Sequence, residues 1–454
     1  MRASWLAGLA ALPASRALKG GVPPTSDPSQ TVIVEDDNSC PDYSSYAYGR
    51  HEPISPGRYS LSYQRPYPAC RTFNASEVEE TIHQMARSIR DPDLFRLFEN
   101  CFPNTLDTAI TWRGHAKGNK HEELTFITTG DINAMWLRDS ANQLQTYLPL
   151  LRPSPSTKSL ASLFRGAINL QARYILAAPH CNAFHAPPEA TKYAKSSSFS
   201  SGSTDYITPA PDPSIVFECK YELDSLAAFL QLSHDYHSAT DDTNFFSRFH
   251  WLDTVDAILN MTSDLLGGTY NRDGSVAYQP YIFQRTTNSA YETLGNAGVG
   301  APVKGGTGMV RSAFRPSDDA CLYQLFVPAN MMFSRYLGET AGIAERLGKN
   351  ALAKRMRTLA GGIRQGIEKY GRVNHRRYGK IYAYEVDGYG SYNAMDDANI
   401  PSLLSMPLFG FVARDDPIYQ NTRRFVLSKE NPYYMFGPVI NGYVSVHAAS
   451  KFRG

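Results

Sequence analysis

The sequence predicts an all-α fold in which helices of ordinary length alternate with long polar loops. Apolar residues recur at helical spacing in several separate segments, whereas strand-like alternation is scarce and short. The intervening loops contain Gly, Pro and Asp, which are typical of turns. A helical array with loops of this kind is expected to build its functional site at one end of the helices.

Apolar stripes define the expected helices. The first helix begins at Ser76, because Ser76 and Glu79 have the spacing of a capping box and apolar residues then follow at helical spacing. A shorter helical pattern contains Leu144 and Leu148. Four further stripes occupy residues 160–175, 223–236, 249–259 and 347–363. The best strand-like alternation occurs at 278–283 and 380–386.

The chain divides into three parts. Residues 1–17 combine a basic residue, a short apolar run and small residues, which predicts a weak secretory signal peptide; a frayed tail or a wrongly assigned start codon is the alternative. Residues 18–70 are rich in Pro, Ser, Gly and Tyr and predict an extended arm. Residues 71–454 then form the folded domain, with a Ser-rich, mobile insertion at 186–213. No segment supplies about 20 consecutive apolar residues, so we expect no membrane span.

The composition excludes some partners. The 454 residues include 45 Lys and Arg against 43 Asp and Glu, so the net charge of +2 gives no reason to expect nucleic acid or an acidic membrane surface as a partner. The 28 Tyr and 22 Phe are numerous. Aromatic rings stack on the apolar faces of sugars, although most such rings in any protein belong to the core.

Cysteines and glycosylation acceptors bear on the compartment. None of the six cysteines lies in a C-x-x-C pair, so a zinc ribbon is not expected, and the sequence leaves their pairing open. Asn74-Ala75-Ser76 and Asn260-Met261-Thr262 are acceptors for N-glycosylation if the chain enters the secretory route. With the N-terminal pattern, they predict a secreted glycoprotein.

Residues 129–140 are the first segment with candidate site residues. They contain Trp136, Arg138 and Asp139 just before a helical pattern. Arg138 and Asp139 have the donors and acceptors needed to bind adjacent sugar hydroxyls. The alternative is a local ion pair between them, with Asp139 or Ser140 capping the helix.

Residues 217–226 are the second segment with candidate site residues. Glu218, Glu222 and Asp224 lie within seven positions of one another, beside Lys220 and Tyr221. Paired carboxyl groups are needed for general acid and base catalysis of glycoside hydrolysis. The alternative for Asp224 is structural, because an acid in the first turn of a helix is favoured by the helix dipole.

Two later segments repeat this chemistry. Residues 314–320 follow a Gly-rich stretch whose spacing matches neither a phosphate loop nor a dinucleotide fingerprint, and residues 395–402 contain two adjacent acids and an amide. A glycosidase pocket needs such groups to protonate the leaving oxygen, activate water and hold hydroxyls. Helix capping is the alternative; calcium binding is disfavoured, because neither pair of acids has EF-hand spacing. The polar residues concerned are Arg315, Asp318, Asp319, Asp396, Asp397 and Asn399.

These four segments, in this order, resemble the motifs of glycoside hydrolase family 125. The resemblance implies an (α/α)6 toroid, exo-acting α-1,6-mannosidase activity on a mannose-containing glycan, inversion at the anomeric carbon, and neither metal nor cofactor. Matching the family motif to Tyr221-Glu222-Leu223-Asp224-Ser225 makes Asp224 the general acid. The same motifs imply that the sugar is bound by Arg138, Asp139, Arg315, Asp318, Asp319 and Asn399.

The resemblance ends after Asn431-Pro432-Tyr433-Tyr434. Family members continue into further helices and a segment that carries the Glu acting as general base, and residues 435–454 show no counterpart. We therefore expect a toroid that is incomplete at its C-terminus and a site without that base, which neither Glu385 nor Asp396 is expected to replace. The alternatives to an active mannosidase are an inactive mannose-binding relative or a truncated gene product, and a helical interaction scaffold, which would lack an acidic pocket.

Overall fold

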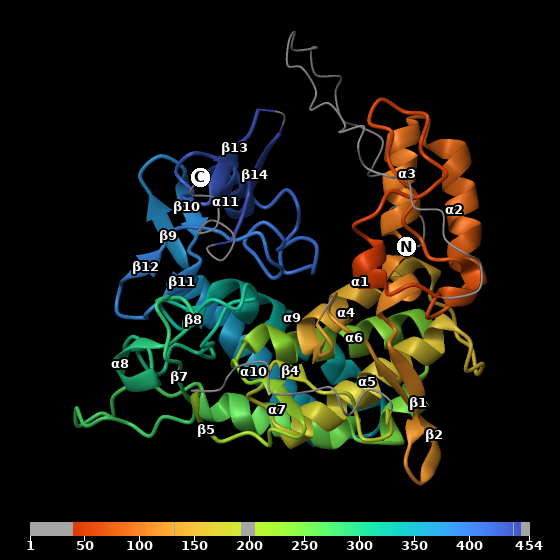
Figure 1. Cartoon of the computed structure of the whole chain (residues 1–454). Helices are drawn as coiled ribbons and strands as arrows, with labels where there is room; N and C mark the ends of the chain where they lie inside the picture. Colours follow the sequence, from red (N-terminus) through yellow and green to blue (C-terminus); the bar gives the residue numbers. More distant parts are fainter. Residues whose placement is uncertain (1–39, 131, 192–204, 439, 446–454) are drawn as a thin grey trace.

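The computed structural model describes residues 40–130, 132–191, 205–438 and 440–445. Its centre consists of two layers of helices (Figure 1). In one layer, α6 packs between α4 and α9; in the other, α5 packs against α6 and α7, and α10 packs against α9 and α7. Consecutive helices thus alternate between the layers. Their bounds are α4 Leu137–Gln145, α5 Leu160–Ala177, α6 Leu223–Thr240, α7 Trp251–Asp264, α9 Val327–Arg346 and α10 Asn350–Gly366.

Local signals explain where these helices begin and end. The side chain of Ser159 caps α5 by accepting from the backbone N–H of Ser162. Helix α6 ends at Thr240, and its C-cap Asp241 adopts a left-handed conformation with φ of 55°. Between its ends, α6 buries apolar side chains on nearly every face, because it lies between two helices of its own layer and beneath α5.

The prediction of an all-α fold is wrong in one respect, because short antiparallel strands are also present. They pair in two three-stranded sheets, β3–β4–β6 and β8–β11–β12, and in four two-stranded sheets, β1–β2, β5–β7, β9–β10 and β13–β14, among the described residues. The bounds are β1 Trp112–Ala116, β2 Asn119–Phe126, β3 Met135–Trp136, β4 Ala183–Phe184, β5 Tyr206–Thr208, β6 Val216–Glu218, β7 Ile282–Gln284, β8 Leu325–Phe326, β9 Arg372–His375, β10 Gly379–Tyr382, β11 Glu385–Val386, β12 Tyr392–Asn393, β13 Tyr434–Phe436 and β14 Asn441–Tyr443.

The three-stranded sheets position the site. Strand β3 leads directly into α4, β8 leads directly into α9, and β6 precedes α6 by a short turn. Because β3 and β6 flank β4 in one sheet, the N-terminal ends of α4 and α6 are held together. The side chains of the first turns of these helices therefore face a common region.

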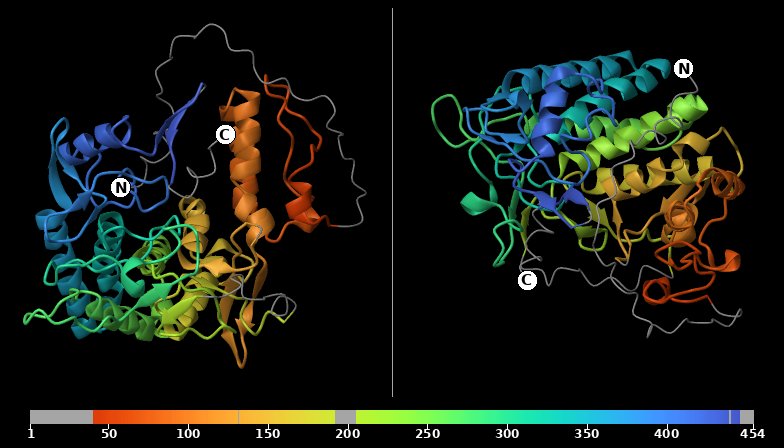
Figure 2. Two further views of the ribbon diagram at one scale, coloured as in Figure 1. Left: turned by 60° about the vertical axis from the view of Figure 1, so that its left-hand side comes forward. Right: turned by 90° about the horizontal axis from the view of Figure 1, so that it is seen from above.

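The N-terminal and C-terminal parts rise on the same side of the helical layers (Figure 2). The N-terminal part contains α2 and α3, and the arm packs there through buried Arg65, which binds Glu79 of α2 and Asp107. Because Glu79 is taken by Arg65 and Arg71, the expected capping box is absent, and Ala75 is the N-cap. The remaining elements are α1 Tyr43–Tyr46, η2 Pro68–Cys70, α2 Ser76–Ser88, α3 Pro92–Cys101, η3 Thr105–Ala109, η4 Leu148–Leu150, η5 Thr243–Ser247, α8 Gly295–Gly298, η6 Ile367–Gly371 and α11 Pro417–Val426.

The helices expected from apolar stripes are confirmed as α2, α4, α5, α6, α7 and α10, whereas α3, α9 and α11 were not predicted. The expected signal peptide at 1–17 lies outside the described residues, as does much of the Ser-rich insertion. Within the described part, no helix is long and apolar enough to cross a membrane.

Candidate active site

Arg138, in the first turn of α4, is the centre of a buried group of carboxyl side chains. Its Nη1 donates to Oε2 of Glu222 over 2.7 Å and to Oδ2 of Asp224 over 3.3 Å, while Nη2 lies 3.0 Å from Oδ2 of Asp139. Glu222 and Asp224 are completely buried, whereas the side chain of Asp139 is 29% exposed. The guanidinium therefore joins the first turns of α4 and α6.

Burial dominates the electrostatics of this group. It raises the pKa of Asp224 to about 6, with the charge of Arg138 opposing the shift and the carboxylates of Asp139 and Asp318 adding to it. Burial also raises the pKa of Glu222 well above its usual range, against Arg138 and with the help of Asp224 and Asp318. One guanidinium cannot balance several buried carboxylates, so the site retains a proton near neutral pH.

Asn182 extends the group through buried hydrogen bonds. Its Nδ2 lies 3.3 Å from Oε2 of Glu218 and 3.4 Å from Oε1 of Glu222, and its Oδ1 accepts from the backbone N–H of Lys220 over 3.0 Å. The neighbouring disulfide between Cys181 and Cys219 ties together the same two segments. Asn182 and this disulfide thereby hold the strand–turn segment that leads to Asp224.

A tight turn supplies the next carboxyl group. The backbone N–H of Arg315 donates to the carbonyl of Asp319 over 2.8 Å, and that of Asp318 donates to the carbonyl of Arg315 over 2.9 Å. Asp318 has a φ of 64°, in the left-handed region that Asp tolerates better than most residues. Its charge acts on Arg138, Glu222 and Asp224, so the turn brings Asp318 to the first group.

Arg315 is part of a second buried group. Its Nε donates to Oε1 of Glu385 over 2.6 Å, and its guanidinium lies 5.3 Å from the centre of the Tyr384 ring. Asn399 donates to Oδ1 of Asp397 from its backbone N–H and from Nδ2, over 2.9 and 2.8 Å. Burial raises the pKa of Asp397, with the charge of Arg315 opposing the shift.

Glu385 and Asp396 have structural partners. Glu385 accepts from Arg315 and, over 3.2 Å, from Nδ2 of Asn393. Asp396 accepts from the backbone N–H groups of Leu403 and Leu404 over 2.9 and 3.0 Å, and burial raises its pKa to about 8. Both side chains are fully buried, which disfavours either as a base for a bound water.

The structure brings most of the predicted residues together. Arg138, Asp139, Asp224 and Asp318 meet in the first group. Arg315 and Asn399 belong to the second, where Asn399 is engaged with Asp397, and Asp319 is buried in the intervening turn. Glu385 and Asn182, which were not predicted as site residues, join them.

The local ion pair and the helix caps that the sequence offered as alternatives to sugar binding are found only in part. The local ion pair between Arg138 and Asp139 is present, but Trp136 is the N-cap of α4, so neither Asp139 nor Ser140 is. Glu222 is the N-cap of α6 without making a side-chain capping bond, because Arg138 and Ser225 engage its carboxylate. Asp224 lies in the first turn of α6, as expected.

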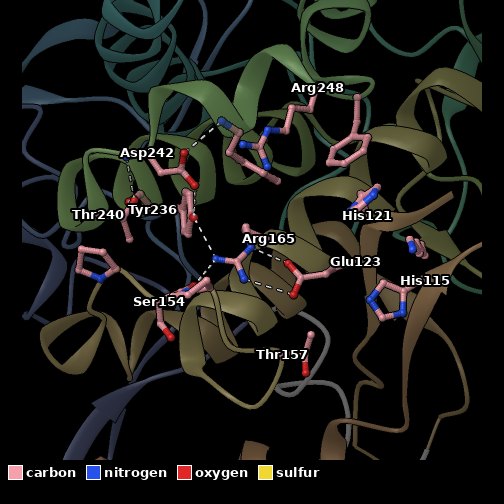
Figure 3. A pocket seen from close by; sticks show the side chains of 15 residues that line it. His115, His121, Glu123, Ser154, Thr157, Arg165, Tyr236, Thr240, Asp242 and Arg248 are labelled. Atoms are coloured by element: carbon pink, nitrogen blue, oxygen red, sulfur yellow. Dashed lines mark hydrogen bonds and ion pairs between the residues drawn. The ribbon is translucent and has the colours of Figure 1, made fainter.

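A separate cavity of about 490 Å³ lies at the opposite end of α6. It is lined by Arg165, Glu123 and Tyr236, and Arg165 donates to both of the others (Figure 3). At 1.5 Å per residue, Asp224 and Thr240, which also lines the cavity, are about 24 Å apart along the helix. None of the predicted site residues lines this cavity, so it is distinct from the acidic site. Within the described part, no three His, Cys, Asp or Glu side chains are grouped to hold a metal ion.

Comparison with known proteins identifies the family. Residues 91–452 match the family model described as metal-independent alpha-mannosidase, GH125. The chain belongs to glycoside hydrolase family 125. The match continues past residue 434, where the motif resemblance ends. As a family 125 protein, the chain is a glycoside hydrolase of the α-mannosidase type.

Two relatives accompany this match. The Meiotically up-regulated gene 157 protein of Schizosaccharomyces pombe (strain 972 / ATCC 24843) is 47% identical over 411 residues, which cover 90% of this chain and 78% of that protein. A solved structure of a Streptococcus pneumoniae metal-independent α-mannosidase, in a non-productive complex with α-1,6-mannobiose, is similar with a TM-score of 0.69 and 32% identity. That similarity covers 83% of this chain and 82% of the other.

Proposed function

We propose that this family 125 protein releases terminal α-1,6-linked mannose from a glycan, with inversion at the anomeric carbon and Asp224 as the general acid. The observation that carries the proposal is the buried Asp224 carboxyl, whose pKa is raised to about 6 beside Arg138. A carboxylic acid that keeps its proton near neutral pH is what protonation of a glycosidic oxygen requires. The α-1,6 linkage is supported by the α-1,6-mannobiose in the complex of the similar pneumococcal protein.

In this mechanism, the proton of Asp224 passes to the glycosidic oxygen as the bond between that oxygen and the anomeric carbon breaks. A water molecule forms the new bond to the same carbon from the opposite face and gives its proton to a second carboxylate. Arg138 and Asp139 supply a donor and an acceptor for hydroxyl groups of the departing mannose. Asp318, on its tight turn, adds negative charge beside Arg138.

The proposal is tested by incubating the purified protein with α-1,6-mannobiose and following the reaction by proton NMR. We expect β-mannose to appear first and to equilibrate later with the α-anomer, and we expect α-1,2- and α-1,3-mannobiose to be poor substrates. First appearance of α-mannose would contradict inversion. Binding of the disaccharide without release of mannose would instead identify an inactive mannose-binding relative.

We further propose that the two layers of helices belong to an (α/α)6 toroid. The alternation of consecutive helices between the layers supports this architecture, as does the similarity to the pneumococcal structure. An experimental structure would test it directly: six inner and six outer helices closing into a ring are expected, and an open two-layer sheet of helices would contradict it.

We also propose that the protein is secreted or acts within the secretory pathway. Disulfides between Cys40 and Cys70 and between Cys181 and Cys219 support an oxidising compartment. The exposed acceptor Asn74 is compatible with glycosylation. Alkylation of the native protein from its source would test this: Cys101 and Cys321 are expected to be the free thiols, whereas alkylation at Cys181 or Cys219 would contradict it.

A further inference from the structure

Glu222 and Asp224 compete for one nitrogen of Arg138. Nη1 lies 2.7 Å from Oε2 of Glu222 and 3.3 Å from Oδ2 of Asp224. In the described part of the chain, Arg138 is the only cation in an ion pair with either carboxyl group. Because Coulomb attraction falls with distance, the nearer carboxylate receives more of the stabilisation that Arg138 provides.

Two further side-chain donors favour a negative charge on Glu222, whereas its hydrogen bond with the Asp318 side chain raises its pKa. Ser225 donates its hydroxyl to Oε2 of Glu222 over 3.2 Å, and Asn182 approaches Oε1 with Nδ2 at 3.4 Å. In contrast, Oδ1 of Asp224 is buried and has no hydrogen-bond partner among the described residues. Donors stabilise the ionised form of a carboxyl group. Besides Arg138, Asp224 has among these residues only a backbone hydrogen bond that lowers its pKa, whereas Glu222 has two side-chain donors. Burial raises the pKa of Asp224 to about 6 and that of Glu222 well above its usual range, so burial alone does not make Glu222 the ionised group. The shorter contact with Arg138 and the side-chain donors are what favour the charge on Glu222.

Other charged and titratable groups face this pair from several elements. Asp139 faces it from α4 and Asp318 from the turn at 315–319, and both add negative charge. The Cys321 thiol and the phenols of Tyr221 and Tyr281 lie near it, and burial raises the pKa of each. These neighbours add no positive charge that would neutralise both carboxylates, so ionisation of one opposes ionisation of the other.

We propose that Glu222 is a positioning residue that carries the negative charge opposite Arg138 and thereby keeps the catalytic proton on Asp224. The inference rests on the proposed role of Asp224 as general acid. It assigns different tasks to two carboxyl groups of one motif: Glu222 holds Arg138 in place and stays ionised, and Asp224 remains protonated until a leaving oxygen takes its proton.

The pH profile of Glu222→Gln tests this assignment. The amide keeps the shape of the side chain but removes the charge, so Arg138 then stabilises the ionised form of Asp224 alone. In the pH profile of kcat on α-1,6-mannobiose, ionisation of Asp224 sets the limb at high pH. This limb is expected to shift to lower pH by about one unit, which lowers kcat about tenfold at neutral pH with little change in KM. The loss is expected to disappear at low pH, where Asp224 regains its proton.

Two variants serve as controls. Glu222→Asp keeps the charge and is expected to keep the limb near its wild-type position. Glu123→Gln removes a largely buried carboxylate that is also bound to an arginine (Figure 3) and that lies by the cavity at the opposite end of α6, and it is expected to leave the limb unmoved. The proposal is overturned if Glu222→Gln loses activity equally at all pH values, or if Glu123→Gln moves the limb by the same amount.

A second measurement requires no turnover. The unfolding equilibrium constants of the wild type, Glu222→Gln, Asp224→Asn and the double variant are compared between about pH 4 and pH 7. Between these pH values, the change in the unfolding equilibrium constant of the double variant is expected to differ at least about tenfold from the product of the changes in the two single variants, because each carboxyl group alters the ionisation of the other. Additive changes would overturn the inference, whereas absence of mannose release by the wild type would contradict only the proposed function.

Discussion

Nη1 of Arg138 lies 3.3 Å from Oδ2 of Asp224, although the two residues are 86 positions apart in the sequence. The sheet formed by β3, β4 and β6 creates this contact by holding the starts of α4 and α6 together. A carboxyl group that is buried there, with a single shared cation, costs folding free energy when it ionises. The contact therefore links the proposed catalytic proton to the stability of the fold.

Asp224→Asn is expected to become more stable relative to the wild type as the pH rises. Burial raises the pKa of Asp224 from 3.8 to about 6 in the folded chain, so the wild type loses stability as the pH rises from the lower value through the higher one. The shift corresponds to about 3 kcal/mol, which the variant should not lose. Chemical unfolding at about pH 3.5 and pH 7 checks this, and an equal difference between the two proteins at both pH values would contradict it.

Arg138→Met is expected to destabilise the protein by about 3–5 kcal/mol at neutral pH, because it leaves two buried carboxyl groups without their cation. The penalty should shrink at acidic pH, where both are protonated. Arg355→Met is the matched control, since Arg355 pairs with Asp256 at the surface with both side chains about half exposed, and should cost no more than about 1 kcal/mol. Similar losses in the two variants would refute the buried-pair interpretation.

The two disulfides are expected to differ in their effect on activity but not on stability. Their sequence separations of 38 and 30 residues predict similar stabilisation, about 3–4 kcal/mol each. Cys181 and Cys219 directly precede Asn182 and Lys220, so the double serine variant should also slow mannose release at least about tenfold. Serine at both Cys40 and Cys70 should lower the unfolding temperature while leaving the rate unchanged. Equal rates of the two variants would remove the link between the bridge and the site.

Expression through a secretory pathway is expected to yield a glycan at Asn74. Asn74 is exposed in the loop before α2, and Ser76 is exposed as well. At the other acceptor, Asn260 accepts from Arg355, and the hydroxyl of Thr262 is buried and donates to the carbonyl of Ile258. Peptide mass spectrometry before and after enzymatic deglycosylation checks occupancy, and an unmodified Asn74 in secreted protein would contradict the expectation.

Several helices could be predicted from their apolar stripes, including α6, although it is buried on nearly every face; α9 and the shortest elements could not. The stripe at 347–363 gives α10, whose exposed face is polar. Helix α9 is the longest helix described but buries every residue from 327 to 334, and therefore all its faces, so its sequence shows no clean stripe. Strands of two or three residues, such as β3 and β8, are too short to show alternation.

The same limit applies to the site. The motif around Asp224 could be found from sequence because several acids are concentrated there, but the pairing of Arg138 with Glu222 spans 84 positions and depends on how the sheets hold the helix starts. Asn182 gives no signal beyond its place after a cysteine, because its role comes from a contact with residues 36 and 40 positions away. Long-range contacts of this kind arise only from the folded arrangement.

The most direct test of the central claim is the rate of mannose release from α-1,6-mannobiose by the wild type and by Asp224→Asn at matched concentrations of folded protein. General acid catalysis contributes about 10²–10⁴-fold, so kcat should fall by that factor in the variant. Equal rates for the two proteins would show that Asp224 is not the acid.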